Sequence, residues 1–129
     1  MKLLTEAQRE KLVDNGRRQA PVRGTERELD FEPVVKLFTP DAGATWLLTE
    51  IEPDAPDIAW GLCDLGVGCA EFGTVSLAEL ADVRGCLGLP VERDLSFKAI
   101  APISAYVEEA LKTGRIVEHF DASRYRRRG

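Results

Sequence analysis

Residues 33–65 read PVVKLFTPDAGATWLLTEIEPDAPDIAWGLCDL, and this stretch predicts three short strands joined by two turns. Apart from Lys36 the first strand is apolar, and Pro40 and Gly43 after it are residues that turns favour. Prolines at positions 53 and 56 then end the second strand, because each removes a backbone donor. The connections are too short for a crossover helix, so neighbouring strands must pair antiparallel.

Side chains of a strand alternate between its two faces, which divides residues 45–52 into two sets. The sets, one on each face, are Thr45, Leu47, Thr49 and Ile51 and then Trp46, Leu48, Glu50 and Glu52. Because one set is half acidic, we expect an antiparallel sheet with one face in water. Each of the tryptophans is expected in the core, with one of them a candidate for exposure as a protein-contact anchor.

Helical patterns flank the predicted sheet. A capping box at residues 5–8 and the typical stop formed by Asn15 and Gly16 predict a helix over residues 6–15. Residues 17–27 lack periodicity and predict a long loop. The later segments predict a fourth strand over 71–75, a short helix from Ser76 to about residue 83, an edge strand over 91–98 and a helix over 103–113.

Together these elements predict an α+β fold, in which an antiparallel sheet of four to five short strands is packed by two to three helices. The 129 residues suffice to bury one core without disulfides. We expect a single domain over residues 1–120, followed by a basic, disordered tail over residues 121–129.

The net charge of −5 conceals a segregation of charge along the chain. Residues 37–83 contain nine acids and no Lys or Arg, whereas arginines dominate the C-terminus. No segment approaches the roughly 20 apolar residues of a membrane span, and the N-terminus has no signal-peptide pattern. Three cysteines without a C-x-x-C pair favour a cytoplasmic protein with reduced, buried thiols.

Five segments follow one another in a specific order along residues 1–116. They are TEAQ (5–8), PVVKLFTP (33–40), TWLLTE (45–50), GLCDLG (61–66) and LPVERD (89–94). In these segments the chain resembles the DUF2958 family of small bacterial proteins, which plasmids, integrative elements and phages often carry. The resemblance implies a compact α+β domain of a mobile element, and it implies no activity, cofactor or catalytic residue.

The candidate residues form no established catalytic, cofactor-binding or metal-binding motif. Gly66 and Gly68 lack the third glycine of a dinucleotide-binding turn, and Asp64 is instead expected to cap the turn at Gly66. The cysteines and His119 do not have the spacing of zinc ligands, and His119 is expected at the surface. Whether the protein is an enzyme stays open, and carboxylate chemistry around Asp64 and Glu71 is the third of three hypotheses.

The first hypothesis is a non-enzymatic accessory protein that binds a basic protein partner through an acidic sheet face. The partner would be a nucleic-acid enzyme or a defence complex. The mobile-element setting that the resemblance implies suggests a narrower form, an inhibitor of host defence of the anti-CRISPR or anti-restriction type. The predicted contact residues are Glu50, Glu52, Asp54, Asp57, Asp64, Glu71 and Trp46.

The alternative hypothesis is a nucleic-acid-binding module in which arginines contact phosphates. It requires the arginines of the long loop to lie on the same side of the molecule as the C-terminus. The residues concerned are Arg17, Arg18, Arg23, Arg126, Arg127 and Arg128.

Overall fold

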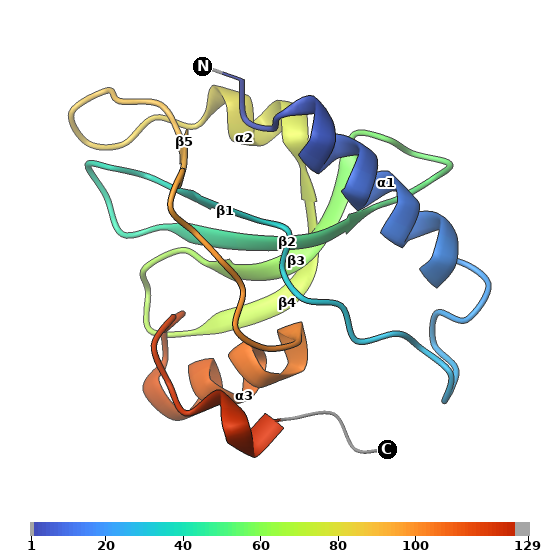
Figure 1. The fold of residues 1–129 in the computed structure, drawn as a ribbon. Helices are drawn as coiled ribbons and strands as arrows, with labels where there is room; N and C mark the ends of the chain where they lie inside the picture. The colour runs from blue at the N-terminus through green and yellow to red at the C-terminus, as the bar shows by residue number, and fades with distance from the viewer. Residues whose placement is uncertain (1, 126–129) are drawn as a thin grey trace.

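A computed structural model describes residues 2–125 and contains a five-stranded antiparallel sheet with the strand order β4-β3-β2-β1-β5 (Figure 1). The predicted α+β fold class is confirmed. None of the helices within residues 2–125 has the length and apolarity to cross a membrane. The elements are α1 (Glu6–Gln19), β1 (Val35–Phe38), β2 (Thr45–Ile51), β3 (Ile58–Asp64), β4 (Ala70–Ser76), α2 (Leu77–Asp82), β5 (Glu92–Arg93), α3 (Ile103–Thr113) and the 3-10 helix η1 (Ala122–Tyr125).

Strand β2 contains one residue more than strand β3 can pair with, and this extra residue is Thr49. Leu48 pairs with Gly61, whereas Glu50 pairs with Trp60, the adjacent residue of β3. An extra residue of this kind is a β-bulge, and it disturbs the alternation of side chains along the strand that carries it.

The predicted two sets of residues 45–52 are therefore wrong beyond the bulge. Before it, Leu47 faces the α3 side of the sheet and Leu48 faces the α1 side. After it, Glu50 lies on the same face as Leu47, and Ile51 lies on the same face as Leu48. The bulge thus allows Leu48 and Ile51 to pack in the core on the α1 side, while Leu47 packs on the α3 side. It also turns Glu50 toward α3.

Both faces of the sheet are covered over β2 and β3, so the expected wet face is absent there, and exposed residues occur on the edge strand β4. Figure 1 shows α1 and α2 on the upper side and α3 on the lower side. Each side buries its own apolar cluster, which is where most of the stabilising burial occurs. The upper cluster includes Leu12, Leu37, Trp46, Leu48 and Leu80, and the lower cluster includes Leu47, Leu62, Ile103, Tyr106 and Ala110.

Helix α1 continues through Asn15 and Gly16 to Gln19, so the predicted stop and the start of the predicted loop are both wrong. Asn15 is buried, and its Nδ2 donates to the carbonyl of Thr49 at 2.9 Å. Gly16 lies so close to β2 that a Cβ there would be 1.8 Å from the carbonyl oxygen of Ile51. The Asn-Gly pair therefore serves a helix–strand contact and not a helix end.

The other predicted elements agree more closely with the structure. Helix α3 has the predicted bounds and ends at Gly114, whose φ is 79°. The Ser76 side chain caps α2 as expected by accepting from Glu79 N at 3.2 Å. The predicted edge strand shrinks to β5, because only Glu92 and Arg93 pair with the end of β1.

The C-terminal segment is ordered as far as Tyr125, so disorder from residue 121 onward is a wrong prediction for residues 121–125. The Phe120 ring packs edge-on against Tyr106 and Tyr125, with centroids 5.1 and 5.7 Å apart. The hydroxyl of Tyr125 donates to Glu109, and this hydrogen bond raises the pKa of Tyr125 to about 12. The predicted disorder of residues 126–129 lies outside the described residues.

We predict that Gly16→Ala destabilises the protein by about 2 kcal/mol, because the added Cβ forces α1 away from β2. Urea unfolding measures the loss. The matched control is Gly73→Ala, where a Cβ meets nothing within 4 Å and the backbone has no positive φ. Equal midpoints for the two variants would show that α1 does not approach β2 in this way.

Candidate functional site

Glu50 is a charged side chain with an exposed fraction of only 1%, and the candidate site is built around it. A carboxylate buried without partners would cost several kcal/mol. Two groups compensate: the Arg23 guanidinium forms an ion pair with Glu50 Oε2, and Thr49 Oγ1 donates to Oε1 at 3.1 Å. The carboxylate that the bulge buries therefore needs a cation from another part of the chain, and Arg23 supplies it.

Arg23 reaches this carboxylate from the turns that follow α1. Its guanidinium carbon lies 4.0 Å from the centre of the Trp60 ring, and its Nη2 lies 3.6 Å from Glu52 Oε1. A guanidinium over an indole is attracted by the negative face of the ring. Arg23 therefore contacts two acids and one aromatic ring, which fixes an otherwise irregular segment against the sheet.

Trp60 and Phe72 extend the cluster to the surface. The indole Nε1 of Trp60 donates to Glu52 Oε1 at 2.6 Å, which fixes the orientation of the ring. The Phe72 ring on β4 stacks with the indole at 6.0 Å between centroids, and 39% of Phe72 is exposed. Aromatic surface thus continues from the half-buried Arg23 to solvent.

A pocket of about 310 Å³ opens beside this cluster, between the segment that follows α1, strand β4 and helix α3. Its lining includes Arg23, Glu28, Asp30, Glu50 and Phe72. Three carboxylates and one guanidinium are among these side chains, which therefore carry a formal charge of −2. The arrangement favours a cationic group over an anionic one.

The two acids at the rim of the pocket also hold its backbone in place. Asp30 Oδ1 accepts from Ser104 N at 3.1 Å and so caps α3, whose own N-cap residue, Pro102, makes no side-chain hydrogen bond. Glu28 Oε2 accepts from Gly24 N at 2.7 Å. The pocket wall is therefore organised before any ligand arrives, which lowers the entropic cost of binding.

The residues predicted to form an acidic contact surface do not converge on one face. Trp46 is only 4% exposed and lies in the upper core, and Glu50 is buried on the other side. Asp64 is buried as well, and its two oxygens accept from Gly66 N at 2.8 Å and Ile116 N at 2.9 Å. The predicted cap of the Gly66 turn is confirmed, and Trp46, Glu50 and Asp64 cannot offer exposed surface.

The remaining predicted acids are more accessible, and they lie apart. Asp57 accepts from Ser76 Oγ at 2.5 Å and Ala78 N at 2.9 Å, and these hydrogen bonds lower the pKa of its carboxyl. Asp54 is exposed in the β2–β3 turn, and Glu71 is exposed on β4. Glu52 is half-buried against the indole of β3. Of these four, Glu52 alone belongs to the Arg23 cluster.

The acids of the enzyme hypothesis do not face each other. Asp64 pairs with Ala70, and Glu71 pairs with Cys63. Since consecutive residues of a strand point to opposite faces, Asp64 and Glu71 lie on opposite sides of the sheet. The carboxylate pair that this hypothesis needs is not formed.

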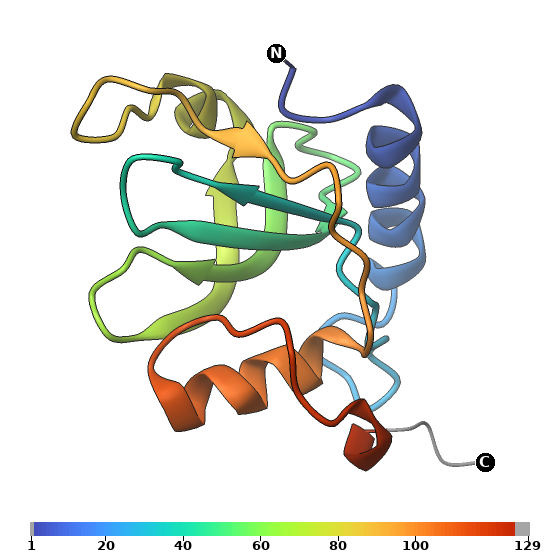
Figure 2. The same ribbon diagram turned by 60° about the vertical axis from the view of Figure 1, so that its left-hand side comes forward.

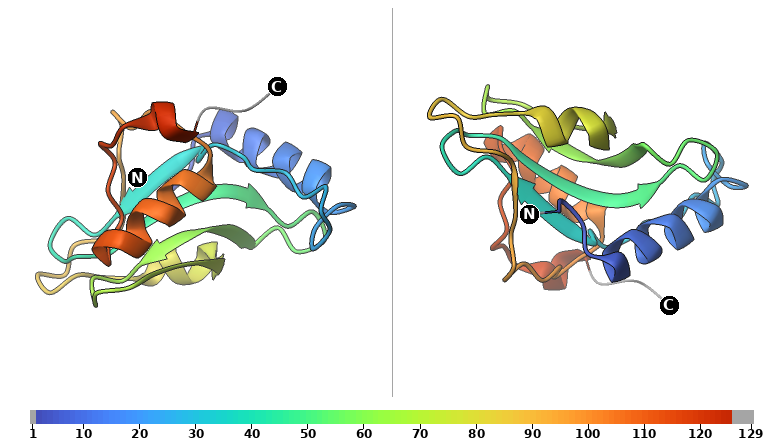
Figure 3. Two further views of the ribbon diagram at one scale, coloured as in Figure 1. Left: turned by 90° about the horizontal axis from the view of Figure 1, so that it is seen from below. Right: turned by 90° about the horizontal axis from the view of Figure 1, so that it is seen from above.

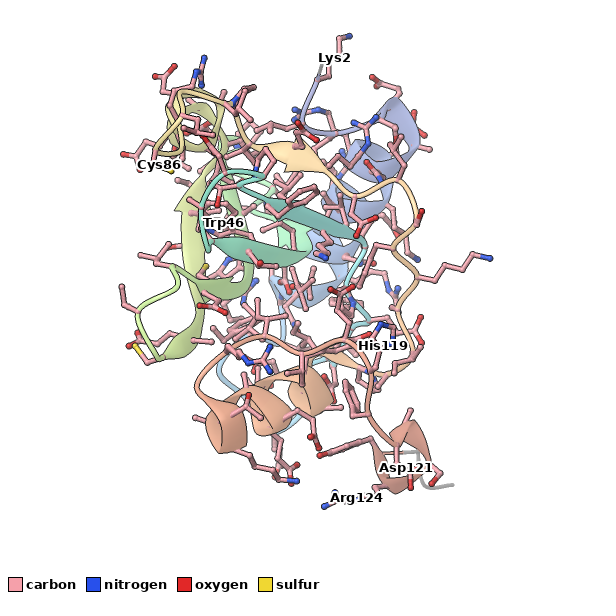
Figure 4. The ribbon with its side chains drawn as sticks, turned by 90° about the vertical axis from the view of Figure 1, so that its left-hand side faces the viewer. Lys2, Trp46, Cys86, His119, Asp121 and Arg124 are labelled. Carbon is pink, nitrogen blue, oxygen red and sulfur yellow. The ribbon has the colours of Figure 1, made fainter. Side chains whose placement is uncertain are left out.

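The thiols do not assemble into a metal site. Cys69 and Cys86 are exposed, so the prediction of buried thiols is wrong for both, whereas burial raises the pKa of the half-buried Cys63 to about 11. His119 lies at the surface, far from Cys86 (Figure 4). Among residues 2–125, no group of three or more His, Cys, Asp and Glu side chains could hold a metal ion.

The arginines of the nucleic-acid hypothesis are divided by their surroundings. Arg17 and Arg18 are exposed at the end of α1, with the Arg18 guanidinium 5.3 Å from the centre of the Phe31 ring. Arg23 is engaged by the acids of the sheet, so it is not free to contact phosphate. The arginines at positions 126–128 lie outside the described residues.

Sequence reasoning placed Glu50 on an open face, treated Arg23 as a free cation, and missed the pocket residues Glu28, Asp30 and Phe72. One signal was available for Glu50, which is an acid in a middle strand whose residues 47, 48 and 51 are apolar. The pocket residues come from distant segments, and no spacing along the chain links them.

The fold and site define a small α+β domain with a buried carboxylate, paired with a half-buried arginine, beside an acidic pocket. The chain belongs to the DUF2958 family, described as a protein of unknown function, whose family model matches residues 3–117. Comparison with curated proteins gave no match, and neither did comparison with solved structures.

We predict that Arg23→Leu costs about 3 kcal/mol of stability, because it leaves Glu50 buried without its cation. Glu50→Gln should cost only about 1 kcal/mol, since the amide oxygen still accepts from Arg23, the amide NH2 can donate to Thr49 Oγ1, and Arg23 retains some exposure. Chemical denaturation measures both, with Arg27→Leu in the same segment as the control for loss of an exposed arginine. If Arg23→Leu costs no more than Arg27→Leu, the buried pair does not form.

Proposed function

We propose that this protein is a non-enzymatic binding module that takes a basic segment of a partner protein into the pocket beside Arg23 and Glu50. The observation that carries the proposal is the pocket lining, which contains three carboxylates and one guanidinium. A partly enclosed site of this charge favours an incoming Lys or Arg side chain. The net charge of −5 acts in the same direction at longer range.

The exposed ring of Phe72 also suits a basic segment of a partner protein. Phe72 is 39% exposed at the mouth of the pocket and is supported from behind by Trp60. Large aromatic side chains next to charged groups are frequent anchors of protein–protein contacts. Arg23 already lies over the indole, so an incoming guanidinium would use the exposed part of Phe72.

The partner class that fits this chemistry is a protein with a basic surface, and nucleic-acid enzymes have such surfaces because they bind phosphates. The narrower form of the proposal is inhibition of a host defence complex of the anti-CRISPR or anti-restriction type. It rests on the mobile-element setting that the family resemblance implies.

One observation favours the alternative, a nucleic-acid-binding module. Residues 30–32 and η1 line a common pocket, so the segment that Arg18 covers lies beside the C-terminal residues (Figure 2). Against it, Glu28, Asp30 and Glu32 are exposed in the same segment and would repel phosphates.

Titration with an oligo-arginine peptide tests the proposal, with tryptophan fluorescence as the readout because Trp60 lies next to the pocket. We expect binding that weakens as salt rises. The double substitution Glu28→Gln and Phe72→Leu should weaken it about tenfold, since it removes one charged and one aromatic contact. The matched control is Glu79→Gln, which removes the same charge from the exposed surface of α2.

Equal weakening by the double substitution and by the Glu79 control would mean that only net charge attracts the peptide, which contradicts a pocket. Absence of binding at low salt would contradict the proposal outright. Binding of single-stranded DNA in place of the peptide would instead support the nucleic-acid alternative.

A further inference from the structure

A second pocket lies on the opposite side of the sheet, between the first turn of α1, helix α2 and strand β5. Its volume is about 760 Å³, more than twice that of the pocket beside Glu50. Figure 3, right, looks onto this side of the molecule, with α1 and α2 toward the viewer. The volume falls in the range of sites for small molecules.

The inner wall of this pocket is the rim of the upper core. Leu4, Leu77 and Val91 line it, and each of them also belongs to the buried cluster beneath α1. Their exposed fractions are 5%, 8% and 6%, so they present small, fixed apolar surfaces. Such a wall can hold the apolar part of a ligand without rearrangement of its own side chains.

The rim of the pocket is cationic. Arg9 from α1, Arg93 from β5 and Lys2 from the N-terminal segment contribute to its lining. None of these three takes part in an ion pair among the described residues. Arg93 Nη1 donates to the carbonyl of Lys2 at 2.7 Å, which closes one side, while the Lys2 side chain extends away from the sheet (Figure 4).

Two acids also line the pocket, and the carboxylate of one of them already accepts hydrogen bonds from α2 and its N-cap. Asp57 accepts hydrogen bonds from Ser76 and Ala78 at the start of α2. Glu6, in the first turn of α1, is the other. Neither acid forms an ion pair with Arg9 or Arg93 among the described residues. A guanidinium presents its donors in a fork that matches the oxygens of a carboxylate or phosphate.

The position of Arg9 on its helix also suits an anionic ligand. Helix α1 buries Leu12, Asn15, Gly16 and Gln19, a stripe with helical spacing that faces the sheet. Arg9 precedes Leu12 by three residues, so it lies one turn before this stripe, and it is exposed. The buried stripe thus begins at Leu12, and the turn before it carries an exposed cation that lines the pocket.

We propose that this pocket binds a small amphiphilic oxyanion. The carboxylate or phosphate group pairs with Arg9 and Arg93, and the apolar body of the ligand rests on Leu4, Leu77 and Val91. The site is separate from the pocket of the proposed function and opposite to it in charge, so the two can be occupied independently.

Two dyes that share an aromatic body test this proposal. One is 1-anilinonaphthalene-8-sulfonate, an amphiphilic oxyanion, and the other is N-phenyl-1-naphthylamine, which lacks the sulfonate. We expect the sulfonate to bind with a stoichiometry of one and the uncharged dye to bind at least about tenfold more weakly, because a charge-assisted hydrogen bond is lost. Amide chemical shifts should move at Leu4, Val91 and Arg93.

Arg9→Met should weaken binding of the sulfonate about tenfold, because it removes one guanidinium and keeps helix propensity. The control is Arg17→Met, on the exposed side of the same helix and outside the pocket. Equal affinity for the two dyes, equal effects of the two substitutions, shifts confined to other surfaces, or no binding of the sulfonate would each overturn the proposal.

Discussion

The bulge at Thr49 is the constraint on which the rest of this structure depends. One extra residue in β2 turns Ile51 into the core beneath α1 and Glu50 into the opposite side of the sheet. Asn15 of α1 donates a hydrogen bond to the carbonyl of Thr49 at the bulge, and Gly16 allows the helix to approach β2 closely. A bulge costs ladder hydrogen bonds, and here side chains from outside the sheet replace part of them.

The buried carboxylate then organises the segment between α1 and β1. Glu50 needs a cation, Arg23 supplies it, and Trp60 gives the guanidinium a surface to lie on. The acids of residues 37–83 therefore have different structural roles. Asp57 and Asp64 hold backbone N–H groups, and Glu50 holds Arg23. The segregation of charge along the chain therefore does not produce an acidic face, and of the acids of residues 37–83 only Glu50 lines the acidic pocket.

The strands, α3 and the turn at Gly66 could be predicted because their signals are local: alternation, helical spacing, and a glycine or capping side chain at the end. The bulge could not be predicted, since it is set by contacts of Asn15 and Arg23 with residues far away in sequence. The Asn15–Gly16 stop failed for the same reason: a local turn signal was overridden by a helix–strand contact.

The arrangement of Arg23 over Trp60 is the most direct consequence of this account. Proton NMR tests it, because the ring current of an indole at 4.0 Å moves the side-chain protons of Arg23 upfield. We predict that these protons resonate well upfield of those of Arg27, the exposed arginine of the same segment, and that Trp60→Leu abolishes the difference. Coincident shifts for Arg23 and Arg27 in the unsubstituted protein would contradict the account.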